Sequence, residues 1–312
     1  MAAKSDFYSE IASNKRRTLL LMFVFSLVVL VLGYALGAYW GSPAAGLVMA
    51  FVISLAMAWS SYYWSDRFVL ALYHARPAEK DQFPQLVNVV EGLSIAAGLP
   101  MPAVYVIDDP SPNAFATGRN PEHSVICVTT GLLQAMDRYE LEGVIAHEMS
   151  HIRNYDILVA TVAVVLAGVV VLLGNWLTRS LFFGGRRRSS SSRGGNPIML
   201  VLMLVGVLFA LLSPLVAQLM RMAVSRRREY LADASSVQLT RYPEGLASAL
   251  AKLSALHAPM RDADNATAHL FIVNPLGGKS LSSLFSTHPP IEDRIARLHA
   301  MDMGEIRPDA PR

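Results

Sequence analysis

Uncharged apolar residues gather in long blocks along this chain. No charged residue occurs from position 18 to 65, and a Gly-Ser-Pro sequence beginning at Gly41 interrupts that block near its middle. Two further uncharged stretches cover residues 157–178 and 194–220. Each half of the first block, and each later stretch, supplies the roughly 20 residues with which a helix crosses a hydrocarbon core of about 30 Å. The pattern predicts four membrane helices.

The first of these helices carries small residues at a regular interval. Gly33, Gly37 and Gly41 follow one another at four-residue spacing, which brings them to one face of a helix. Such a face lets a second helix approach closely, and packing within the chain is favoured over dimerisation. The stretch lacks a small-residue cleavage site, so we expect an anchor that stays in the protein. The oligomeric state remains open, a homo-oligomer included.

Shorter patterns between and after the apolar blocks predict a small domain outside the membrane. Apolar residues at helical spacing and alternating apolar residues distinguish helices from strands. Helices are expected at 83–97, 243–256 and 290–301, and strands at 103–107 and 125–129. The fold class is therefore α+β, mainly α, with a four-helix transmembrane region joined to this domain.

Composition agrees with a membrane protein. Hydrophobic residues make up 53% and charged residues only 16%, whereas an ordinary soluble protein is about a quarter charged. The net charge of +3 comes from basic residues beside apolar segments, which suits a lipid bilayer and no nucleic acid. Cys127 is the single cysteine, so no intrachain disulfide forms, and its apolar neighbours suggest a buried strand residue.

A pair of histidines gives the strongest chemical signal. His147 and His151 stand at i and i+4 with Glu148 beside the first, which is the spacing of a zinc-protease helix. Asp137 and Glu140 have the spacing of a capping box, so a helix is expected to begin there and run through the motif. The alternative is a pair of core histidines satisfied by ordinary hydrogen bonds.

A catalytic zinc site needs a third protein ligand and one open position. Glu229 is the best candidate, with Asp233 four residues later on the same helical face. One carboxylate can bind metal while the other accepts the remaining N–H of a ligand histidine. Taken alone, the stretch also fits a solvated charged helix.

Together these motifs resemble the HtpX family of bacterial membrane zinc metalloproteases, which are gluzincins related to the type I CAAX prenyl endopeptidases. The resemblance extends to residues 113–118 and 286–294 and to the order of the apolar blocks. It implies a gluzincin-type protease domain that binds one Zn²⁺. The implied roles are metal ligands at His147, His151 and Glu229, a general base at Glu148 and a supporting carboxylate at Asp233.

The expected reaction is peptide hydrolysis by a water on the metal, with Glu148 taking its proton and passing it to the leaving amine. His288 is a candidate hydrogen-bond donor to the oxyanion and Arg294 a candidate orienting group, with Tyr230 and Tyr242 as weaker candidates. Asn113 begins a candidate edge for a substrate bound as an added strand, although a turn between strands is an equal alternative.

Topology follows from the metal site, because both ligand-bearing segments must lie on one side of the membrane. Basic residues before the first helix and after the fourth place the termini and this site in the cytoplasm, whereas the arginines near Ser190 oppose that orientation. Either the positive-inside rule fails locally or the last two helices do not cross fully; full crossing is preferred. The expected parts are a cytoplasmic segment (1–17), two membrane helices (18–64), the first protease part (65–156), a membrane hairpin (157–220) and the second protease part (221–312).

The expected function is cleavage of misfolded or damaged membrane proteins, or of other unfolded polypeptides, at the bacterial inner membrane. A prenyl-processing endopeptidase is one alternative, although such enzymes carry more membrane helices than four. A non-enzymatic scaffold with structural zinc is the other, although it would need a closed four-ligand site.

Overall fold

The computed structural model of the chain describes residues 7–39, 41–166, 168, 226–256, 258–263, 267–276 and 289–302. These residues divide into two compact units. Residues 18–63 belong with 162–168 to one unit, called the helical unit below. Residues 7–17 and 64–161 belong with those from 226 onward to the other, called the sheet unit. The fourth predicted membrane stretch, and the third beyond residue 168, lie outside the described residues.

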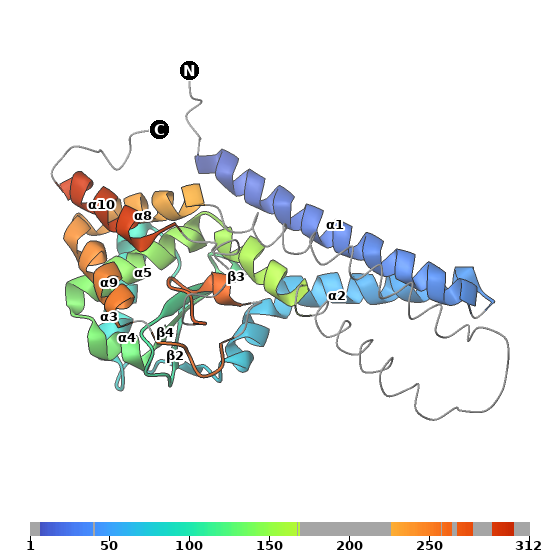
Figure 1. Ribbon diagram of the computed structural model, residues 1–312, viewed down its shortest axis with the longest axis horizontal. Coiled ribbons are helices and arrows are strands. Elements are labelled where there is room, and N and C mark those ends of the chain that lie inside the picture. The colour runs from blue at the N-terminus through green and yellow to red at the C-terminus, as the bar shows by residue number, and fades with distance from the viewer. Residues whose placement is uncertain are drawn as a thin grey trace, which may run out of the picture. The chain divides into compact units, whose positions relative to one another are not determined.

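Two long helices contain the first apolar block. Helix α1 spans Phe7–Tyr39 and α2 spans Pro43–Leu72 (Figure 1). Within the described residues, Ile11–Ala38 and Pro43–Leu72 are long and apolar enough to cross a membrane. Both helices extend beyond the uncharged block, because neither flanking polar segment within them contains a glycine or proline that would end a helix.

The predicted close packing of the first helix occurs against the second within the same chain. A β-carbon on Gly33 would lie 2.2 Å from Cβ of Ala50, and one on Gly37 would lie 2.8 Å from Cα of Gly46. Gly41 has a different function, since its φ of +83° lies in the turn between the helices. Two of the three glycines therefore let the helix backbones approach each other.

A four-stranded sheet organises the sheet unit. The strands are β1 (Arg76–Pro77), β2 (Ala103–Ile107), β3 (Ala114–Asn120) and β4 (His123–Thr129), in the order β1-β2-β4-β3. β2 runs parallel to β4, whereas β3 pairs antiparallel with β4. The strands expected at 103–107 and 125–129 are confirmed. The 113–116 stretch contributes to β3, which lies at the edge of this sheet.

Helices complete the unit. They are α3 (Pro84–Ala97), α4 (Thr130–Ala135), α5 (Arg138–Arg153), α8 (Arg226–Thr240), α9 (Pro243–Ala255) and α10 (Ile291–Asp302), with the 3₁₀ turn η2 (Ala268–Leu270). α5 packs against β3 on one side and against α3, α8 and α9 on others (Figure 1). The predicted helices at 83–97, 243–256 and 290–301 are confirmed within one residue at each end.

The core of the sheet unit explains why α5 is fixed so firmly. Its apolar residues Leu141, Val144, Ile145, Met149 and Ile152 are all buried in one cluster with the sheet and α9. The polar residues of the motif therefore occupy the remaining face of the same helix. Burial of this apolar stripe, at about 25 cal/mol per Å², stabilises the helix that carries the motif.

Candidate metal centre

The helix that presents the histidines begins with the predicted capping box. The Asp137 side chain accepts from the Glu140 backbone N–H, and the Glu140 side chain accepts from the Asp137 N–H. One helical turn separates His147 from His151, and their Nε2 atoms lie 3.2 Å apart. His147 is buried and His151 is partly buried. The local sequence thus fixes where the helix starts and which side chains face each other.

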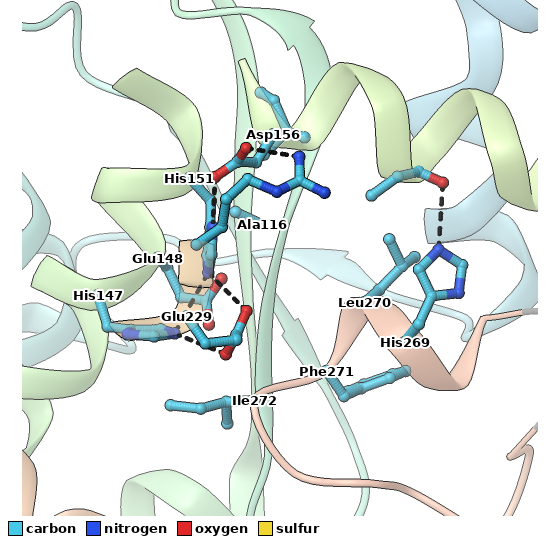
Figure 2. Close-up of a pocket in the computed structure, with 13 residues that line it drawn as sticks. Ala116, His147, Glu148, His151, Asp156, Glu229, His269, Leu270, Phe271 and Ile272 are labelled. Carbon is cyan, nitrogen blue, oxygen red and sulfur yellow. Dashed lines mark hydrogen bonds and ion pairs between the residues drawn. The ribbon is translucent and has the colours of Figure 1, made fainter. Parts of the chain in front are cut away.

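Glu229 of α8 meets the two histidines. Its carboxylate oxygens lie 3.7 Å from Nε2 of His147 and 3.6 Å from Nε2 of His151, as the dashed lines in Figure 2 show. One ligand atom from each residue lies within 4.8 Å of the others. Ligand atoms placed tetrahedrally at about 2.0–2.1 Å from Zn²⁺ stand roughly 3.3 Å apart. The spacing and the N,N,O donor set therefore fit a zinc ion.

A buried carboxylate and a buried arginine support His147. Oδ1 of Asp233 lies 3.0 Å from Nδ1 of His147. Arg294 donates to both oxygens of Asp233, through Nε at 2.9 Å and Nη2 at 2.7 Å, and it is fully buried. Burial alone would raise the pKa of Asp233, but the charge of Arg294 and the hydrogen bond to His147 hold that pKa below its usual value.

The second histidine has an equivalent support that the sequence reasoning missed. Nδ1 of His151 lies 3.0 Å from Oδ2 of Asp156, and Arg228 donates to Oδ1 of the same carboxylate at 2.9 Å. Burial lowers the pKa of His151, yet the hydrogen bond to Asp156 and the charge of Glu229 outweigh it and raise that pKa to about 9. Burial opposes ionisation of Asp156 too, but its partners hold its pKa below the usual value.

A pocket opens over these residues. Its wall includes Ala116 of β3, Glu148 of α5 and residues 269–272, as Figure 2 shows. The backbone of this last segment pairs with the edge of β3, since Ile272 donates to the carbonyl of Ala114 at 3.0 Å and Phe271 bridges Phe115. Part of the edge that faces the site is therefore occupied by the chain itself.

The remaining candidate residues lie in different surroundings. Asn113 is buried and donates from Nδ2 to the carbonyl of Val273 at 2.8 Å, outside the residues that line the pocket. Tyr230 stacks with the guanidinium of Arg297 at 3.5 Å, and Tyr242 packs on Tyr139 at the surface. His288 lies outside the described residues.

Sequence reasoning had little access to the support of His151. Asp156 follows the end of α5 and therefore falls outside the helical spacing that linked the other residues. Its one signal is its position as the charged residue directly before the third apolar stretch. Asn14, which donates to Asp156 at 2.7 Å, is 142 positions away and carries no motif.

Comparisons with known proteins agree with this geometry. A model of peptidase family M48 matches residues 80–302. A protease HtpX homolog from Dictyoglomus thermophilum is 50% identical over 295 residues, covering 95% of each chain. Another from Lactobacillus acidophilus is 46% identical over 297 residues, covering 94% of this chain and 99% of the relative.

A solved structure shares the fold. The crystal structure of S. mikatae Ste24p aligns with a TM-score of 0.52 at 22% identity, over 93% of this chain and 67% of that one. Within the described residues, two helices are long and apolar enough to cross a membrane, and His147, His151 and Glu229 lie close enough to hold a metal ion. The chain belongs to peptidase family M48 and is a membrane metalloendopeptidase related to the HtpX proteases.

Proposed function

We propose that the protein is a zinc-dependent endopeptidase that acts on polypeptides at a membrane. The observation that carries the proposal is the convergence of His147, His151 and Glu229, with Glu148 in the same pocket. These three side chains would hold the ion. A bound zinc supplies Lewis acidity, which lowers the pKa of water and polarises the scissile carbonyl.

Glu148 is the proposed general base. It is adjacent to a ligand histidine in sequence, lines the pocket and is nearly fully buried. Its carboxylate would take a proton from the attacking water and pass it to the leaving amine as the peptide bond breaks. A covalent enzyme intermediate is unnecessary in this scheme, because water attacks directly.

Two further residues would prepare the site for this chemistry. Asp233 orients His147 through Nδ1, and Arg294 fixes Asp233 with two hydrogen bonds. The imidazole then keeps its Nε2 turned toward the metal position. His288 remains the candidate donor to the oxyanion formed at the attacked carbonyl.

The substrate is proposed to bind as an added strand on β3. Main-chain hydrogen bonds accept many side-chain sequences, which suits a protease that degrades varied proteins. Ala116 lines the pocket, whereas the edge at Ala114 and Phe115 already pairs with residues 271–272. The added strand would therefore lie beyond Phe115, and Asn113 would act indirectly by fixing the loop at Val273.

The finer membrane assignment is also a proposal. Two candidate spans are described, and the uncharged stretches at 157–178 and 194–220 would add a hairpin between the ligand-bearing helices. Basic residues flanking the first and fourth stretches favour termini and metal site in the bacterial cytoplasm. A site directly before an apolar stretch favours membrane-protein substrates, in keeping with quality control of damaged or misassembled ones.

The deciding experiment compares cleavage with metal binding. The detergent-purified protein is stripped with chelator, reloaded with Zn²⁺ and given an unfolded membrane-protein substrate beside Glu148→Gln. We expect zinc to restore cleavage in the native sequence, while Glu148→Gln binds zinc normally and loses at least about 10²-fold in rate. Glu142→Gln is the control, because Glu142 lies on the same helix in a surface pair with Arg138. Full activity in zinc-loaded Glu148→Gln contradicts the assignment.

A further inference from the structure

A buried side chain of the first helix reaches the metal centre. Asn14 lies on the part of α1 that belongs to the sheet unit, and it is fully buried. Its Nδ2 donates to Oδ1 of Asp156 at 2.7 Å and to the carbonyl of Asn154 at 2.9 Å. Its Oδ1 accepts from Nη1 of Arg228 at 2.9 Å. Both ends of this amide therefore contribute to one network.

That network fixes the carboxylate that touches the second candidate ligand. Oδ1 of Asp156 accepts from Asn14 and from Arg228, the latter at 2.9 Å. The other oxygen, Oδ2, lies 3.0 Å from Nδ1 of His151. With one oxygen held by two donors, the second is aimed at the imidazole. A carboxylate in this position sets the tautomer of the ring and its orientation toward a metal.

The first helix also holds the backbone of the turn directly before Asp156. Tyr155 has a φ of +59°, a left-handed conformation that non-glycine residues adopt only where their surroundings impose it. Nζ of Lys15 lies 4.5 Å from the centroid of the Tyr155 ring, and the amide of Asn14 binds the preceding carbonyl. Adjacent residues of α1 thus constrain the turn on both sides of its strained residue.

We propose that Asn14 is a positioning residue for the metal centre, acting through Asp156 on His151. The proposal rests on the metal site proposed above. The chain of contacts runs from the amide of Asn14 to the carboxylate of Asp156 and from that carboxylate to the imidazole of His151. The start of the first helix would then belong to the catalytic apparatus, although the M48 match begins only at residue 80.

The test measures zinc affinity directly, by competition with a chromophoric chelator on the full-length protein in detergent. We compare Asn14→Asp, which keeps the shape but loses the donor, with Asn14→Ala and Asp156→Ala. Losing a carboxylate or its support behind a ligand histidine costs about 10–100-fold in metal affinity. We expect about tenfold for either change at Asn14 and up to 100-fold for Asp156→Ala. Gln82→Ala, which removes an amide from an exposed hydrogen bond, should stay within twofold.

Two additional readouts separate positioning from a purely structural contribution. At saturating zinc, Asn14→Asp should regain most of kcat with KM unchanged, and the visible spectrum of its cobalt-substituted form should differ from that of the native sequence. Unchanged zinc affinity in both Asn14 variants overturns the proposal, even if their melting temperatures fall. If Asn14→Ala does not fold, the isosteric Asn14→Asp decides. Failure of the native sequence itself to bind zinc would instead refute the proposed function.

Discussion

At the scale of single residues, each candidate ligand histidine is backed by a carboxylate and each carboxylate by an arginine. His147 rests on Asp233 and Arg294, whereas His151 rests on Asp156 and Arg228. Both Nδ1 atoms are thereby engaged, and both Nε2 atoms are left to face Glu229. This duplication orients both imidazoles as metal ligands, and a metal binds such rings in their neutral form.

Zinc affinity should accordingly depend on pH. In the metal-free protein the pKa of His151 is raised to about 9, because its carboxylate partners outweigh the effect of burial. The imidazole is therefore protonated at neutral pH. A metal and a proton compete for the ligand nitrogen of His151, so zinc binding at neutral pH releases a proton. Between pH 6.5 and 8 we expect apparent zinc affinity to rise about tenfold per pH unit, measured by chelator competition. A flat profile would show that His151 is already neutral before metal arrives.

Substitution of Arg294 tests the network that supports His147 through Asp233. Removing its charge leaves Asp233 as an uncompensated buried carboxylate, which typically costs 3–5 kcal/mol. We expect Arg294→Gln to lower the free energy of unfolding by about 3 kcal/mol, and Arg294→Lys by less, in denaturant titrations of the metal-free protein. Arg138→Gln, at an exposed pair on α5, should change it by under about 1 kcal/mol. Equal effects at the two arginines would count against the buried-pair argument.

Sequence spacing identified three of the four residues grouped around His147, because a helix repeats every 3.6 residues. His147, Glu229 and Asp233 all follow from that rule. Arg294 was expected to orient the attacked carbonyl, and its contact with Asp233 was not predicted. Asp156 did not follow from that rule, because a turn separates it from the helix of the histidines. Asn14 did not follow either, because it lies 142 positions before Asp156. Contacts of that kind exist only in the tertiary structure.

At the scale of elements, the crossing of α5 and α9 sets the position of the motif helix. A β-carbon on Gly143 would lie 2.7 Å from the backbone nitrogen of Leu246 and 2.9 Å from its Cα. Backbone atoms cannot move aside as a flexible side chain does. The absence of a side chain at Gly143 therefore helps α9 to pack directly on the helix that carries the histidines.

Paired glycine substitutions test this crossing. Gly143→Ala should lower the free energy of unfolding by about 1–3 kcal/mol through overpacking. Gly92→Ala, at a helical position of α3 with nothing within 4 Å of the added carbon, should raise it by about 0.4–1 kcal/mol. Thermal unfolding of both variants beside the native sequence provides the measurement. Stabilisation by both would show that α9 can shift without cost.

Periodicity predicted the helices and the two inner strands well, because each buries a regular apolar stripe. It gave no warning of residues 267–276, whose contact with the sheet depends on a short 3₁₀ turn and one isolated bridge. Phe271 is held there by the rings of Tyr73 and Phe115, at centroid distances of 5.1 and 4.9 Å. Such a cluster joins three distant segments and leaves no repeating pattern in any of them.

At the scale of the whole molecule, the remaining question is how often the chain crosses the membrane. Composition alone identified four apolar stretches, yet length and hydropathy cannot decide whether the arginine-rich connection between the last two crosses. The positive-inside rule places that connection in the cytoplasm. A metal site shared across two full crossings places it on the opposite side of the membrane. The sequence therefore predicts the number of candidate membrane helices, but not whether the last two cross the membrane.

Labelling of a single introduced cysteine resolves the crossing. Burial raises the pKa of the only native thiol, Cys127, so it stays protonated and contributes little background. We expect Ser190→Cys to react with a membrane-impermeant maleimide in intact cells, as full crossing requires. Reaction only after permeabilisation would instead place the connection in the cytoplasm.

The wide separation of the site residues along the chain also bears on biosynthesis. The two histidines are made early, but their third partner and Arg294 come later, the latter 143 positions after His151. At translation rates of about 5–20 residues per second, that interval lasts roughly 7–30 s. A nascent chain holding only its histidines lacks a complete binding set, so the protease would stay inert beside the ribosome and the insertion machinery until Glu229 and Arg294 have been made.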